Sequence, residues 1–78
     1  METLAHTGQR LKSVIREYNL SDQTITSLTP FEQSYLSKIY TSRDIQPRQL
    51  QNFLYVINKV FDLEISSDSI LSRELFHA

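Results

Sequence analysis

The chain contains no cysteine, and its 78 residues include only one glycine and two prolines. Without cysteine it can form neither disulfide bonds nor a thiolate metal site, and nothing in the sequence points to an oxidising compartment. So few glycines and prolines leave almost none of the turn signals that an all-β domain needs every ~10 residues. These shortages predict an all-helical protein.

Long apolar runs and a strong net charge are also missing. The longest apolar run, Phe53 to Ile57, is much shorter than the roughly 20 residues that cross a bilayer. Residues 1–11 contain no apolar signal segment. The formal net charge is -1 and 40% of the residues are hydrophobic, which is typical of an ordinary globular domain. We therefore expect one small cytoplasmic domain, whose modest core would be helped by oligomerisation.

Two stretches have the apolar spacing of amphipathic helices. The first runs from about Thr7 to Tyr18 and is closed by Asn19. Its inward positions are Leu11, Val14, Ile15 and Tyr18. The second begins at Pro47, a residue that suits the first helical position. Its inward positions are Leu50, Phe53, Leu54, Ile57, Val60 and Phe61. These two helices should supply most of the core.

Two shorter helices are predicted between them. Ser21 is the expected N-cap of a short helix with Ile25 and Leu28 facing inward. The second short helix is predicted to start at Thr29 to Glu32. Thr29 would be the cap, Pro30 would lie in the first turn and Glu32 would complete a capping box. The inward positions of this helix are Phe31, Tyr35, Leu36 and Ile39. Its outward positions are Gln33, Ser34, Ser37, Lys38 and Thr41.

The C-terminal end is open to two interpretations. Leu63 and Ile65 alternate with acidic residues, which allows a brief extended piece. Ser66 or Ser67 could then cap a last short helix that carries Ile70, Leu71 and Leu75. We expect residues 1–65 to form the main domain and residues 66–78 to form a C-terminal helix or tail.

No residue pattern supports catalysis or metal binding. His6 and His77 lie near opposite ends of the chain, and neither has a neighbouring histidine or cysteine at ligand spacing. A phosphate-cradling loop needs several glycines, and the nine acidic residues are scattered. We therefore expect no enzymatic activity, no metal and no cofactor.

Charge is unevenly distributed along the chain. Residues 1–60 contain seven basic and five acidic side chains, a net charge of +2, whereas residues 61–78 contain one basic and four acidic side chains, a net charge of -3. A basic front part can approach phosphates, although the overall pI of about 6.0 is low for a nucleic-acid binder.

The order of the helices is that of a helix-turn-helix, a short helix followed by a capped one between two supporting helices. In that motif the second helix enters the major groove of DNA, and short polar side chains on its outer face contact base edges. Gln33, Ser34, Ser37 and Lys38 would form this face. An ordinary hydrophilic helix face is the alternative interpretation.

The sequence resembles the phage-repressor and Cro-like (XRE-type) helix-turn-helix family, which includes antitoxins. The matching residues are Gly8 to Lys12, Leu20–Ser21, Ser34 to Ile39, Pro47, Leu50, Ile57 and Leu63. The resemblance implies a compact, lambda-repressor-like domain of four to five helices that binds double-stranded DNA as a homodimer. It also implies a regulatory role, as a repressor or as the antitoxin partner of a toxin.

By the same resemblance, Gln33, Ser34, Ser37 and Lys38 contact bases or phosphates, and Arg10, Gln23 and Arg43 contact phosphates. The sequence departs from the family pattern at three places. Thr29–Pro30 stands where the turn usually has a glycine, Asp22 stands where a glutamine often lies near phosphate, and Tyr40 to Ser42 replace a glutamate-glycine pair.

Two functions follow from these observations. The first is a sequence-specific transcriptional regulator, either a repressor or an autoregulating antitoxin. The second is a protein-interaction module on the same fold, such as an antirepressor or a toxin-neutralising antitoxin. The apolar C-terminal residues that could dock on a partner or on a second copy are Ile70, Leu71, Leu75 and Phe76. Packing within the chain's own core is the alternative for these residues.

Overall fold

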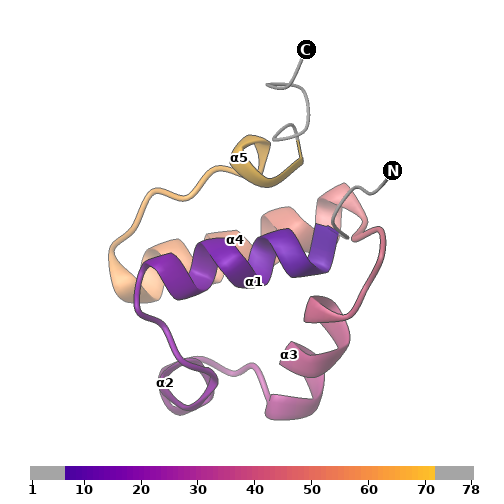
Figure 1. Ribbon diagram of the computed structural model, residues 1–78. Helices are drawn as coiled ribbons and strands as arrows, with labels where there is room; N and C mark the ends of the chain where they lie inside the picture. The colour runs from indigo at the N-terminus through magenta and orange to yellow at the C-terminus, as the bar shows by residue number, and fades with distance from the viewer. Residues whose placement is uncertain (1–6, 72–78) are drawn as a thin grey trace.

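The computed structural model describes residues 7–71, which form five α-helices and no strand (Figure 1). The helices are α1 (Thr7–Glu17), α2 (Asp22–Leu28), α3 (Gln33–Tyr40), α4 (Pro47–Phe61) and α5 (Asp68–Leu71). The predicted all-helical class is confirmed for this part of the chain. Residues 63–65 are irregular, so the brief extended piece forms no strand.

Helix α1 lies between two of the shorter helices. It contacts α3 on one side and α5 on the other, and α2 contacts α3 (Figure 1). In the view of Figure 1, α2 and α3 lie below α1 and α5 lies above it. The short helices α2 and α3 are therefore placed next to each other on one side of the molecule.

The buried core contains most of the predicted inward residues. Those that are confirmed as buried are Leu11, Val14, Ile15, Ile25, Leu36, Ile39, Leu50, Phe53, Leu54 and Ile57. Leu20, Tyr40, Ile45 and Ile65 are also buried, although helical periodicity did not point to them. They come from the ends of helices and from the irregular segments between them.

Three predicted core residues are wrong. Tyr18, Leu28 and Val60 are 45%, 60% and 42% exposed. Each lies in the last turn of a helix or just beyond it, where the chain turns away and leaves the side chain without a covering element. Periodicity gives the direction of a side chain on a helix, but not whether another element lies in that direction.

An aromatic cluster joins α3 to α4. The ring of Phe31 stacks on those of Tyr35 and Phe53, with centroids 5.0 Å apart in both pairs. Tyr40 meets Phe53 edge-on at 6.3 Å. Such offset and edge-on contacts between rings stabilise a fold beyond the burial of apolar area alone. They fix the inner face of α3 and leave its outer face free of core contacts.

The predicted start of α3 is wrong, because α3 begins at Gln33. Thr29 instead ends α2, and its N–H and hydroxyl both donate to the Ile25 carbonyl. The Phe31 N–H then donates to the Thr29 hydroxyl oxygen at 3.1 Å. A residue before proline avoids the helical region, and Thr29 is extended, with φ -127° and ψ 167°. Thr29–Pro30 therefore forms the turn between the helices rather than the first turn of α3.

Other predicted boundaries are confirmed. The Ser21 side chain accepts a hydrogen bond from the Thr24 N–H and caps α2. Pro47 lies at the start of α4. Asn19 follows α1 with a φ of 63°, a left-handed conformation that asparagine adopts more readily than most residues. The local rules for caps and breakers thus hold at both ends of the α1–α2 link.

Helix α5 packs into the same core as the other helices. Ile70 is fully buried, and the Ser66 hydroxyl oxygen accepts a hydrogen bond from the Asp68 N–H at the start of the helix. Ile70 therefore packs within the chain's own core, which is the alternative interpretation for this residue. Leu75 and Phe76 lie outside the described residues, and only the backbone of Leu71 is described.

Gly8 allows α1 and the end of α3 to approach very closely. A Cβ atom at this position would lie 2.5, 2.6 and 2.7 Å from the carbonyl oxygens of Ile39, Tyr40 and Ser42. The Gly8 N–H donates to the Ser42 carbonyl at 3.0 Å, and the neighbouring Thr7 N–H donates to the Arg43 carbonyl at 3.2 Å. A side chain here would push the two backbones apart.

We expect Gly8→Ala to destabilise the protein by about 1–3 kcal/mol, the usual cost of overpacking. A loss of stability would be informative, because replacing glycine by alanine in a helix interior normally stabilises a protein by ~1 kcal/mol. Urea unfolding followed by circular dichroism measures the change. Gln9→Ala, at an exposed position in the same turn, should change stability by less than ~0.5 kcal/mol. A Gly8→Ala variant as stable as the wild type would contradict the close packing.

The side chain of Asn58 holds the segment that leads to α5. Its Nδ2 donates to the Ile65 carbonyl and its Oδ1 accepts from the Ile65 N–H, both at 2.9 Å. Asn58→Ala leaves both backbone groups of a buried residue without partners, so we expect a loss of ~1–3 kcal/mol. Hydrogen exchange should accelerate at residues 65–71 more than elsewhere. Asn52→Ala, at an exposed position on the same helix, is the control. Equal effects of the two variants would contradict the stabilising role of the Asn58–Ile65 hydrogen bonds.

Candidate nucleic-acid interface

The outer face of α3 carries the four residues predicted to contact bases. Gln33, Ser34, Ser37 and Lys38 are all exposed, while Leu36 and Ile39 on the same helix are buried. Their spacing, two adjacent pairs four residues apart, places them on one stripe of a helix. The structure therefore brings these four side chains together on one surface.

The C-terminal end of this stripe is ordered by hydrogen bonds to the backbone. The Thr41 hydroxyl donates to the Ser37 carbonyl at 2.8 Å and lies 3.2 Å from the Lys38 carbonyl. The Lys38 ammonium group has no hydrogen bond or ion pair within residues 7–71. It is thus available to an anion outside the protein.

The N-terminal end of the stripe is joined to α2 by a side-chain contact. The Gln33 Nε2 donates to the Asp22 Oδ2 at 2.9 Å and lies 3.5 Å from the Ser37 Oγ. Asp22 is the first residue of α2 and Gln33 is the first residue of α3. The contact therefore ties together the starts of the two helices of the expected motif.

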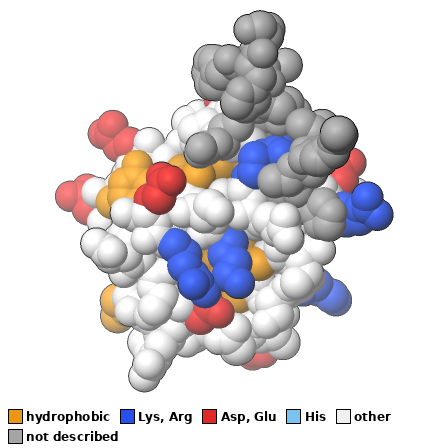
Figure 2. Space-filling model, in the orientation of Figure 1, with side chains coloured by type: hydrophobic (Ala, Val, Ile, Leu, Met, Phe, Trp, Pro, Cys, Tyr) orange, Lys and Arg blue, Asp and Glu red, His pale blue; other side chains and the backbone are white. Residues whose placement is uncertain are grey.

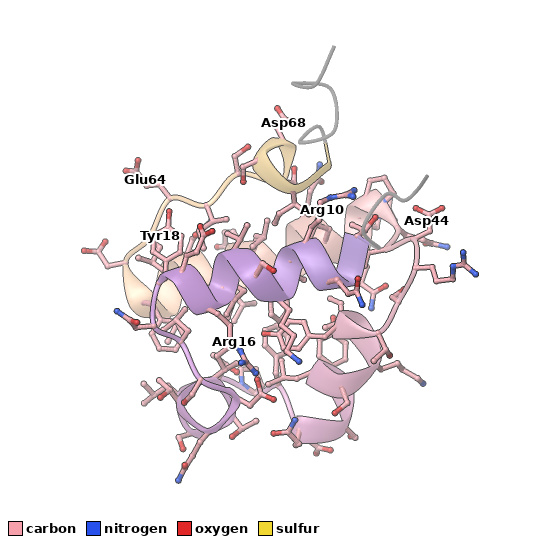
Figure 3. All side chains as sticks on the ribbon, in the orientation of Figure 1. Arg10, Arg16, Tyr18, Asp44, Glu64 and Asp68 are labelled. Atoms are coloured by element: carbon pink, nitrogen blue, oxygen red, sulfur yellow. The ribbon has the colours of Figure 1, made fainter. Side chains whose placement is uncertain are left out.

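A shallow depression of about 530 Å³ lies beside this contact, between the end of α1 and the start of α2. It is lined by Arg16, Asn19, Leu20, Ser21, Asp22 and Gln23. Arg16 extends from α1 toward α2 and α3 (Figure 3), and it shares a second, smaller depression with Lys12, one turn earlier on α1. Lys or Arg side chains lie in the middle of the face that Figure 2 shows. This part of α1 adds positive charge next to α2 and α3.

Tyr40 lies beneath the same region. It is only 5% exposed, and its hydroxyl has no hydrogen-bond partner in the described part of the chain. Burial raises the pKa of this phenol far above its ordinary value, the negative charge of Asp22 raises the pKa further, and Arg16 lowers it. The phenol therefore stays neutral throughout the physiological pH range.

Because a buried polar group without a partner costs free energy, Tyr40→Phe should leave stability unchanged or raise it by ~1 kcal/mol. Chemical denaturation gives the difference. Tyr55→Phe, at a position that is 64% exposed, serves as the control and should have little effect. A loss of more than ~1 kcal/mol for Tyr40→Phe would mean that the hydroxyl is bonded in solution.

The predicted phosphate-binding residues fall into two groups. Gln23 and Arg43 are exposed, Gln23 near the start of α2 and Arg43 in the loop after α3. Arg10 lies elsewhere: it is half-buried, its Nε donates to the Ile70 carbonyl at 2.9 Å, and it points toward α5 (Figure 3). The structure therefore places Arg10 beside α5, and its predicted phosphate contact stays a prediction.

Lys12 and Arg16 are basic residues of α1 that line one depression. Both are exposed, and they are separated by one helical turn, whereas Arg10 lies on a different side of α1. A helical projection places Arg10 and Lys12 on opposite sides of the buried Leu11, at equal angles from it. Which of these two sides lies near α2 and α3 is given only by the tertiary structure.

No metal centre is formed within residues 7–71, where no group of three or more His, Cys, Asp or Glu side chains could hold an ion. His6 and His77 lie outside the described residues. None of the helices in this span is long and apolar enough to cross a membrane.

No family model matches the chain, and no match was found among the curated proteins or the solved structures. The resemblance to the phage-repressor and Cro-like family therefore stays a prediction. The same holds for the repressor and antitoxin roles, the homodimer and the cytoplasmic location that accompany it.

Proposed function

We propose that the protein is a transcriptional regulator that binds double-stranded DNA as a homodimer, with α3 in the major groove. The observation that carries this proposal is the exposed stripe of Gln33, Ser34, Ser37 and Lys38 on a helix whose other face is fixed by the core. A repressor or an autoregulating antitoxin is the role we infer.

The chemistry of the stripe suits base edges and phosphates. The major groove is about 12 Å wide and admits one α-helix. Serine hydroxyls both donate and accept, so Ser34 and Ser37 can bond several bases, and the long side chain of Lys38 reaches guanine or a phosphate. None of these groups can contact DNA unless the helix face is open, and all of them are exposed.

The charges around α3 support phosphate contacts at particular places. Lys38 and Arg43 lie at the C-terminal end of α3, and Lys12 and Arg16 lie on the adjoining face of α1. Asp22 lies at the start of α2 and would repel a phosphate there. Phosphate attraction would therefore come from the C-terminal part of α3, the loop after it and α1, rather than from the first turn of α2.

We expect Lys38→Ala and Arg43→Ala each to weaken DNA binding and to reduce the slope of log K against log salt by roughly one unit. Gel shifts at several salt concentrations, with DNA from upstream of the chain's own reading frame, measure both quantities. Lys59→Ala removes the same charge from the exposed face of α4 and should leave the slope unchanged.

Three outcomes would count against the proposal. These are no salt-sensitive shift of the wild type, equal affinities for the wild type and both variants, and an equal loss in Lys59→Ala. Protection of two half-sites with centres ~34 Å apart would support the dimer, and sedimentation at the same concentrations gives the oligomeric state directly.

The alternative function, a protein-interaction module, depended on the apolar residues near the C-terminus. Ile70 is fully buried in the chain's own core, so one of the four expected docking residues is not accessible. This supports the regulator over the module. If the protein shifts no DNA and a second protein co-purifies with it, the interaction module would be favoured over the regulator.

A further inference from the structure

We propose that the contact between Asp22 and Gln33 sets the base preference of α3, by turning the carbonyl oxygen of Gln33 toward the DNA. This inference rests on the proposed DNA-binding function. It differs from the simpler expectation for a glutamine on a recognition helix, which is a bidentate pair with adenine.

The orientation of the Gln33 amide follows from the chemistry of its partner. The distance between Gln33 Nε2 and Asp22 Oδ2 is 2.9 Å. An ionised carboxylate can only accept hydrogen bonds, so the atom that faces it must be the amide nitrogen. The opposite orientation would place two acceptor oxygens against each other.

The second amide hydrogen is also directed toward the protein. The Gln33 Nε2 lies 3.5 Å from the Ser37 Oγ, one turn along α3. With the nitrogen occupied between Asp22 and Ser37, the amide oxygen Oε1 is the group that remains for a ligand. Gln33 is exposed, so this oxygen can reach solvent or a base edge.

The Asp22 carboxylate is well placed to hold this arrangement. It lies in the first turn of α2, where the helix dipole favours negative charge. Asp22 and Arg16 line the same depression, so a positive charge lies in the same region. Asp22 is also half-buried, which restricts the side chain more than full exposure would.

A glutamine that offers only its carbonyl oxygen recognises a different set of bases from one that offers both the carbonyl oxygen and the amide N–H groups. In the major groove, adenine and cytosine present amino groups that donate, whereas guanine and thymine present acceptors at the corresponding positions. The Gln33 oxygen would therefore favour adenine or cytosine over guanine or thymine. A glutamine released from Asp22 could also donate to adenine N7, and its preference would narrow to adenine.

The test is selection of DNA from a random duplex library by the wild type, Asp22→Ala and Gln33→Ala. We expect the wild-type site to contain one position where adenine and cytosine are accepted equally. Asp22→Ala should favour adenine over cytosine at that position by ~10-fold, and Gln33→Ala should lose the preference there while keeping the rest of the site. Glu64→Ala removes the same charge far from α3 (Figure 3) and should select the wild-type site.

A second variant separates orientation from folding. Asp22→Asn keeps the shape of the side chain but offers both a donor and an acceptor, so Gln33 can take either orientation. We expect Asp22→Asn to reduce the preference for amino-bearing bases over carbonyl-bearing bases. It should not shift the preference to adenine. Circular dichroism of each variant checks that the overall helical content is unchanged.

The outcomes distinguish this inference from the function on which it rests. If the wild type selects no sequence at all, the DNA-binding proposal fails. If it selects a site that Asp22→Ala and Asp22→Asn also select unchanged, DNA binding stands and the orienting role of Asp22 is overturned. A wild-type position that accepts adenine alone would likewise overturn it.

Discussion

The contact between the first turn of α1 and the last turn of α3 is the constraint on which the rest of the arrangement depends. Only a residue without a Cβ allows these backbones to come so close at Gly8. The N–H groups of Thr7 and Gly8, which have no partner within their own helix, donate instead to the carbonyls of Arg43 and Ser42. One contact thus satisfies the start of α1 and fixes the C-terminal end of α3.

The other end of α3 is fixed by different chemistry. Stacking of Phe31 on Phe53 holds the approach to the helix against α4, and Gln33 bonds to Asp22 at the start of α2. The first contact is apolar and partly buried, and the second is polar and open to solvent. Rigid placement of the helix axis therefore comes from the core, whereas the orientation of the first outward side chain depends on one hydrogen bond at the surface.

Much of the fold could be predicted from the sequence, because caps, breakers and periodicity are local. Ser21, Pro47 and the buried stripe of α4 are examples. The start of α3 could not, because Thr29 had two possible local roles, and the extended backbone before Pro30 favoured the end of α2. The burial of Tyr40 and Ile45 depends on which elements meet, and no local pattern gives that. The polar stripe was found from spacing, but its bond to Asp22 joins residues that only the tertiary structure brings together.

The position of Asp22 shows why affinity and selectivity need to be considered separately for this surface. A carboxylate beside a phosphate backbone weakens every duplex equally, so on grounds of charge alone a basic or neutral residue would bind DNA better. The same carboxylate accepts a hydrogen bond from the Gln33 amide, which, under the proposed function, would act at one base pair only. If base contacts specify and phosphate contacts position, the basic residues on α1 and after α3 must supply the attraction that Asp22 removes. A surface of this kind suits a regulator that is released easily from non-specific DNA, because its attraction to phosphates is modest and its discrimination comes from oriented hydrogen bonds.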